Sequence, residues 1–166
     1  MSIQDDEIGL FDFKINNTFA NRLKFGLYYE TVLLELLNKH NLNFKNTSID
    51  NPTSFYDFMR YDTKNKPIII ELKSIVANSN DNIFLVSQYK INQYKKMLKT
   101  NPNLRFIYIF NTVVSKDEYQ FWYHDIDIKK IKNDEYFPTQ LPDGSKYLEV
   151  PLRHFERLED CLERLI

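Results

Sequence analysis

The sequence contains few of the residues that several large classes of functional site require. Only three glycines occur in 166 residues, which excludes a glycine-rich phosphate loop of the Walker or Rossmann type. A single cysteine, Cys161, excludes a disulfide framework and a cysteine-based zinc site. Because Cys161 falls in an amphipathic stretch, we expect it to be a small buried hydrophobic residue.

Long apolar runs and a large excess of charge are also missing. No segment approaches the length of a membrane span, and Met1–Asp12 is acidic without the apolar core of a signal peptide. We therefore expect a soluble intracellular protein with no membrane partner. The formal net charge is −1, so binding to nucleic acid would depend on a local basic surface.

The chain has the size and composition of one globular domain. With 166 residues and 43% hydrophobic side chains, it is long enough to bury a core. We predict a single domain over residues 1–166, with a flexible acidic tail at 1–16 and a polar surface insertion at 126–146. The acidic tail is also a candidate docking segment for a partner protein.

Hydrophobic periodicity predicts an α/β fold. Helices are expected where apolar residues recur every three to four positions, and strands where β-branched and aromatic residues cluster. The order is α-β-β-β-α-β, a mixed central sheet flanked by helices, with extra strands and a helix at the carboxyl end. The predicted helices are Thr18–His40, Ile83–Thr100 and one opened by Pro151; the predicted strands are Asn41–Ile49, Ser54–Tyr61, Pro67–Ser74, Leu104–Asn111, Glu118–Asp125 and Tyr147–Val150.

The second and third predicted strands bring three chemically useful side chains together. Their connection, Asp62–Lys66, is too short for a crossover helix and predicts an antiparallel hairpin. If the hairpin is centred near Lys64, Asp57 faces Glu71 directly. Side chains alternate along a strand, so Lys73 lies on the same side as Glu71.

Asp57 and Glu71 each lie within an apolar run, where an ionised group needs a compensating partner. Two carboxylates at this distance also repel each other, unless a cation lies between them. Mg²⁺ is the natural compensator, because it takes oxygen ligands and keeps positions for water and phosphate. The first helix offers a third carboxylate, Glu30, and Gly26 one turn earlier leaves space beside it.

These residues resemble the signature of the PD-(D/E)XK nuclease superfamily, which includes restriction endonucleases and Holliday-junction resolvases. Fourteen positions separate Asp57 from Glu71-Leu72-Lys73, and the expected elements from Thr18 to Asn111 follow the superfamily's core order. The resemblance implies a restriction endonuclease-like fold in which Asp57, Glu71 and the Leu72 carbonyl hold Mg²⁺, with Mn²⁺ able to substitute. It further implies that Glu30 assists and that Lys73 orients or activates the attacking water. Tyr56 stands where the motif has proline.

The second predicted helix carries lysines and amides but no acids. Gln88, Asn92, Lys95 and Lys99 fall along one stripe, which is either a solvated face or a cradle for a phosphate backbone. Some members of the superfamily use a glutamine on this helix, which makes Gln88 a candidate catalytic residue. The three histidines have no metal-ligand spacing, and none is assigned a functional role.

Three functions fit these observations. The first is an Mg²⁺-dependent nuclease acting on DNA. The second is a catalytically silent, nuclease-like module for nucleic-acid binding or assembly, and the third is an RNA-cleaving member. A homodimer is a further possibility: the aromatic strands Leu104–Asn111 and Glu118–Asp125 fit either its interface or the core of a monomer equally well.

Overall fold

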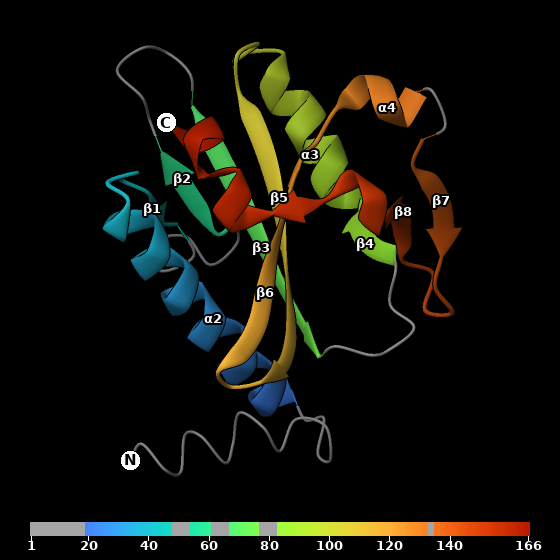
Figure 1. Cartoon of the computed structure of the whole chain (residues 1–166). Helices are drawn as coiled ribbons and strands as arrows, with labels where there is room; N and C mark the ends of the chain where they lie inside the picture. Colours follow the sequence, from blue (N-terminus) through green and yellow to red (C-terminus); the bar gives the residue numbers. More distant parts are fainter. Residues whose placement is uncertain (1–18, 48–53, 61–66, 77–82, 133–134) are drawn as a thin grey trace.

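A mixed sheet of six strands forms the centre of the computed structural model, which describes residues 19–47, 54–60, 67–76, 83–132 and 135–166 (Figure 1). Helices flank this sheet, so the predicted α/β class is confirmed. The strand order is β1-β2-β3-β5-β6-β9. The strands are β1 (Lys45–Asn46), β2 (Phe58–Arg60), β3 (Ile68–Val76), β5 (Arg105–Ser115), β6 (Glu118–Asp125) and β9 (Glu156–Arg157).

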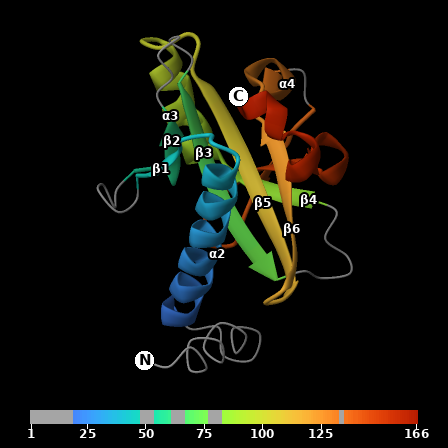
Figure 2. The ribbon, with the colours of Figure 1, turned by 60° about the vertical axis from the view of Figure 1, so that its left-hand side comes forward.

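Helix α2 (Phe19–Lys39) packs on one face of the sheet, as its apolar spacing predicts (Figure 2). Its side chains Tyr29, Leu33 and Leu37 recur every four positions and are fully buried. The helix ends in a Schellman motif: Asn41 has φ 57°, and the Leu42 amide donates to the Leu37 carbonyl at 3.1 Å.

Strands β2 and β3 form the predicted antiparallel pair in the predicted register. Phe58 pairs with Ile70 and Arg60 with Ile68, as expected for a hairpin centred near Lys64. The strand expected over 54–61 is shorter than predicted, because regular pairing begins only at Phe58. The connecting turn, 62–66, lies outside the described residues, as does the acidic tail 1–16.

Strand β3 is covered on both faces. Ile68, Ile70 and Leu72 pack into the cluster around α2, whereas Ile69 belongs to a second cluster on the opposite face. Its parallel neighbour β5 runs from Ile68↔Arg105 to Val76↔Val113. β5 is paired on both edges and almost wholly buried, so its aromatic residues pack in the core of this chain.

The second helix starts five residues later than predicted. Ile83–Ser87 is strand β4, and helix α3 covers only Gln88–Leu98. The Ser87 hydroxyl caps α3 by accepting from the Lys90 amide. An apolar run of this length is compatible with a strand or a helix, and β4 is a strand because it pairs with β8 (Lys146–Pro151).

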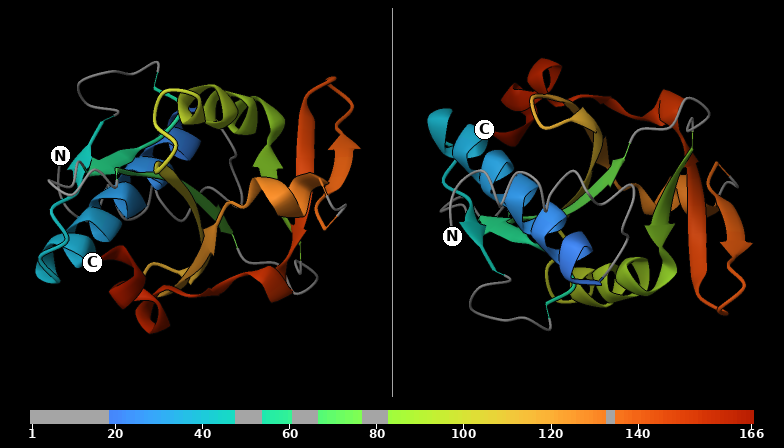
Figure 3. Two further views of the ribbon diagram at one scale, coloured as in Figure 1. Left: turned by 90° about the horizontal axis from the view of Figure 1, so that it is seen from above. Right: turned by 90° about the horizontal axis from the view of Figure 1, so that it is seen from below.

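The described part of the chain also contains a second sheet of three strands, ordered β4-β8-β7. Within residues 126–146, predicted to be a polar surface insertion, lie α4 (Ile128–Lys132) and β7 (Phe137–Gln140); most of the described positions there are at least partly exposed, whereas Tyr136 is fully buried. Together with α3, the second sheet lies across the central sheet from α2 (Figure 3). The predicted strand Tyr147–Val150 is confirmed within β8.

The predicted carboxyl-terminal helix is wrong. Pro151 ends β8, and the chain continues as short 3₁₀ turns, η2 (Leu152–His154), η3 (Leu158–Asp160) and η4 (Leu162–Leu165), around β9. Its apolar residues still face inward, since Leu158, Cys161 and Leu165 join the cluster beneath α2. The expected burial of Cys161 is therefore confirmed. No helix in the described ranges is long and apolar enough to cross a membrane.

Candidate functional site

Asp57 is fixed in place by its own backbone and by the neighbouring strand. Its amide donates to the Ile70 carbonyl at 2.9 Å, and its carbonyl accepts from the Thr47 amide at 2.8 Å. Its side-chain Oδ2 accepts from the Leu72 amide at 2.9 Å. The carboxylate therefore lies against β3 immediately before β2 begins, beside the predicted Glu71-Leu72-Lys73 motif.

Glu71 is a buried acid in the middle of β3, with only 6% of its surface exposed. Its carboxylate forms an ion pair with the ammonium of Lys90, from the first turn of α3. Burial, followed by the charge of Asp57, raises the pKa of Glu71 to about 8, although Lys90 acts in the opposite direction. Such a group binds a cation in preference to staying ionised alone.

Glu30 reaches the same place from α2, with 8% of its surface exposed. Burial is the main cause that raises its pKa to about 8, and a hydrogen bond with the Asp57 carboxyl and the charge of Asp57 add to it. Asp57 thus interacts with both Glu71 and Glu30. Asp57 is therefore the shared partner of two predicted acids, Glu30 from α2 and Glu71 from β3.

Lys73 and Lys90 share one cavity with Glu71. This cavity has a volume of about 410 Å³ and lies between β3 and β5 of the central sheet and β4 of the second sheet. Lys73 is exposed, two residues beyond Glu71, on the side predicted for it. The complete lining is Glu71, Lys73, Ile75, Phe84, Leu85, Ser87, Lys90, Tyr108, Phe110, Leu141 and Tyr147.

Gln88 is not among the residues that line this cavity. Its side-chain amide instead donates to Asn92 Oδ1 at 3.1 Å, along the outer face of α3. Lys90, which the sequence did not single out, is the residue of α3 that contacts Glu71. The signal that could have identified it is the Ser87 cap, because a helix that begins there places Lys90 in its first turn.

The acid cluster supplies oxygen ligands suited to a hard cation. In the part of the chain that the structure describes, no three His, Cys, Asp or Glu side chains are arranged to hold one metal ion together. Mg²⁺ does not require three, since it commonly binds through one or two carboxylates and completes its shell with water and substrate phosphate. Glu71, a buried acid whose ionised form is stabilised by a cation, lies beside Asp57, and this pair fits that mode of binding.

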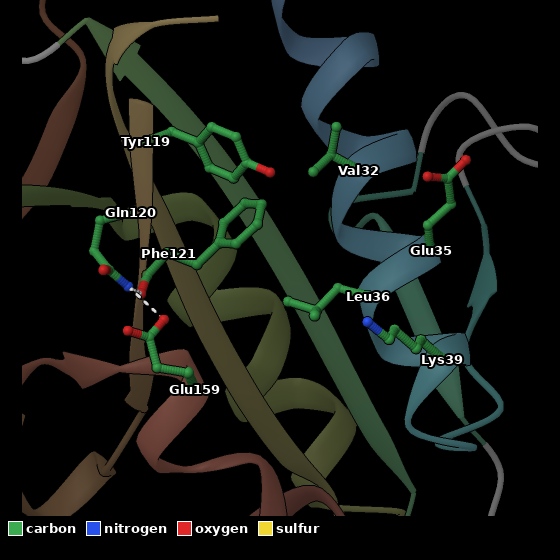
Figure 4. A pocket seen from close by; sticks show the side chains of 8 residues that line it. All are labelled: Val32, Glu35, Leu36, Lys39, Tyr119, Gln120, Phe121 and Glu159. Atoms are coloured by element: carbon green, nitrogen blue, oxygen red, sulfur yellow. Dashed lines mark hydrogen bonds between the residues drawn. The ribbon is translucent and has the colours of Figure 1, made fainter. Parts of the chain in front are cut away.

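A second pocket, of about 390 Å³, lies between α2 and β6 (Figure 4). Val32 and Leu36 of α2 face Phe121 across it, and Glu35 and Glu159 stand at its rim. The Gln120 amide donates to Glu159 Oε2 at 3.2 Å. None of the predicted catalytic residues lines this pocket, so we place the candidate site at the acid cluster.

Comparison with known proteins adds no relative. A search against models of protein families found no match, and a search of curated protein sequences found none either. The evidence for function is therefore the geometry of the site itself.

Proposed function

We propose that this protein is a metal-dependent nuclease that hydrolyses phosphodiester bonds in DNA. The observation that carries the proposal is the convergence of Asp57 with Glu30 and Glu71, beside a cavity that also contains Lys73. The element order α2-β1-β2-β3-β4-α3-β5 has, apart from β4, the α-β-β-β-α-β order of a restriction endonuclease-like core of the PD-(D/E)XK type, which supports the proposal.

Asp57 and Glu71 would hold the cation, with the Leu72 carbonyl as a further ligand and Glu30 assisting from α2. When bound, Mg²⁺ supplies a Lewis acid and lowers the pKa of a bound water. The cation would also favour the ionised form of both glutamates, whose pKa values are raised to about 8 without it. Lys73 would hold positive charge beside the phosphoryl oxygens as negative charge develops on them.

One observation favours a second function, a catalytically silent module that binds nucleic acid. Lys90 already provides a cation for Glu71, so a metal ion is not needed to stabilise the buried acid. In that case the lysines of the cavity would contact phosphate without hydrolysis. Asp57, Glu71 and Lys73 are all retained, however, which favours the nuclease.

Cleavage assays separate these functions. Supercoiled plasmid, linear duplex, single-stranded DNA and RNA are each incubated with Mg²⁺, Mn²⁺ or EDTA. We expect cutting of DNA that requires the metal and is lost in Asp57→Asn and Lys73→Ala. Lys129→Ala, on α4 and away from the cavity, is the matched lysine control and should cut normally. Binding without cleavage by the folded wild-type protein would support the silent module, and cleavage of RNA alone would identify an RNase.

A further inference from the structure

The cavity is lined partly by charged side chains and partly by apolar ones. Lys73, Lys90 and Glu71 all line it, and the Lys90 ammonium is paired with the Glu71 carboxylate. The remaining half-buried lining is mainly apolar or aromatic, contributed by Ile75, Leu85, Leu141 and Tyr147. A ligand that fits both parts carries an anionic group next to a flat, weakly polar group.

A nucleotide has this composition. Its phosphate would lie at the lysines, where charge-assisted hydrogen bonds are strongest, and its base would lie against the apolar wall. The hydroxyls of Ser87 and Tyr147 line the same space and can bond with polar groups on the base. Sites for small ligands combine a mostly apolar lining with a few such polar groups.

The size of the cavity limits what can enter. Its volume of about 410 Å³ is near the lower end of the range for small-molecule sites, which is enough for one nucleotide. A base that is paired and stacked within a duplex cannot enter such a space without leaving its partner, which costs a few kcal/mol. A nucleotide in a single strand enters without that cost. The second sheet creates this limit, because β4 and β8 contribute Leu85 and Tyr147 to the wall.

We propose that the cavity receives one unpaired nucleotide next to the scissile phosphate, and that the substrate class is single-stranded DNA. This inference rests on the proposed nuclease function and deepens it. Duplex DNA would then be cut only where its strands are already separated, as at frayed ends and flaps.

Binding measurements test the cavity without relying on catalysis. The full-length Asp57→Asn protein is titrated against a fluorescein-labelled single strand, and against the same sequence as a duplex, by fluorescence anisotropy in EDTA. We expect the single strand to bind at least about tenfold more tightly, the scale of one base contact. Leu141→Trp, which fills the cavity from the loop after β7, should remove that preference and leave the duplex affinity unchanged. Equal affinity for both DNAs would overturn the proposal.

A second variant tests the cavity independently, in case Leu141→Trp does not fold. Tyr147→Ala removes part of the wall and should weaken single-strand binding alone, with melting temperature as the folding control. If both variants fold and neither changes the affinity for the single strand, the proposed nucleotide site is overturned. Metal-dependent cleavage that is equally fast on duplex and single strand would uphold the nuclease and refute this inference. Preferential single-strand binding without any cleavage would refute the nuclease and uphold the nucleotide site.

Discussion

The ammonium group of Lys90 lies against the buried carboxylate of Glu71, joining the first turn of α3 to the middle of β3. An ammonium in this position provides the charge that a metal ion would provide. In the proposed nuclease, Lys90 and the cation would therefore compete for one carboxylate.

The first prediction concerns this competition. We expect Lys90→Met to bind Mn²⁺ more tightly than the wild type, because the Glu71 carboxylate no longer has a resident counter-ion. DNA cleavage should nevertheless fall by about tenfold or more, since one positive charge near the phosphate is lost. Electron paramagnetic resonance of free Mn²⁺ measures the affinity, and Lys96→Ala, an exposed lysine of the same helix, is the control. Mn²⁺ affinity that is unchanged or reduced in Lys90→Met would contradict the competition.

The second prediction separates structure from chemistry at Asp57. The Leu72 amide needs an acceptor, which Asp57→Asn keeps and Asp57→Ala removes. Both variants should lose cleavage, but Asp57→Ala should be less stable than Asp57→Asn by about 1–3 kcal/mol. Urea denaturation of the two variants gives this difference directly. Equal stability would mean that the hydrogen bond from Leu72 contributes little.

The third prediction is a dependence of stability on pH. The pKa values of Glu30 and Glu71 rise to about 8 on folding, so the folded state holds protons that the unfolded state releases above its ordinary 4.5. Their contribution to the free energy of unfolding should therefore decrease as pH rises from about 4.5 to about 8. Thermal melting of wild type and Glu71→Gln across this range measures it, and the variant should depend less on pH. Saturating Mg²⁺ should reduce the dependence in the wild type alone.

The fourth prediction is a stability that decreases as pH falls, the opposite direction to the third. His124 is buried, its Nδ1 donates to the His154 carbonyl at 2.9 Å, and its Nε2 accepts from the Tyr136 hydroxyl. Burial lowers the pKa of His124 from 6.5 to about 4, so the unfolded state takes up a proton first as pH falls. Stability should be complete above about 6.5 and decrease as pH falls towards 4. His124→Gln should flatten this acid limb in thermal melts, and an unchanged acid limb would exclude His124 as its cause.

Much of the site could be predicted because its pattern is local. The register of β2 on β3 depends on a short connection and on apolar alternation, both readable within about twenty residues. That register is why Asp57 could be expected beside Glu71 and Lys73 on β3. Glu30 is predicted from the family resemblance and from Gly26 one turn earlier, and the structure places it against Asp57.

Features that depend on distant partners could not be predicted in this way. Ile83–Ser87 is a strand because β8 pairs with it, and its apolar run alone is compatible with a strand or with the start of a helix. The late start of α3 directs Lys90 to Glu71, whereas the expected helix favoured Gln88. The carboxyl-terminal residues kept their predicted burial but not their helix, because β9 pairs there with β6.

The pairing of β4 with β8 also determines at which stage of the chain's synthesis the cavity can form. Ser87 and Tyr147 meet across these strands although about sixty positions separate them in the sequence, so the contact cannot form before β8 has been synthesised. The ribosome delivers the acid cluster and α3 well before it delivers β8. A nascent chain can therefore assemble Asp57, Glu71 and Lys90 while the cavity wall is still missing. Any selectivity that this wall provides is acquired only once β8 has been synthesised.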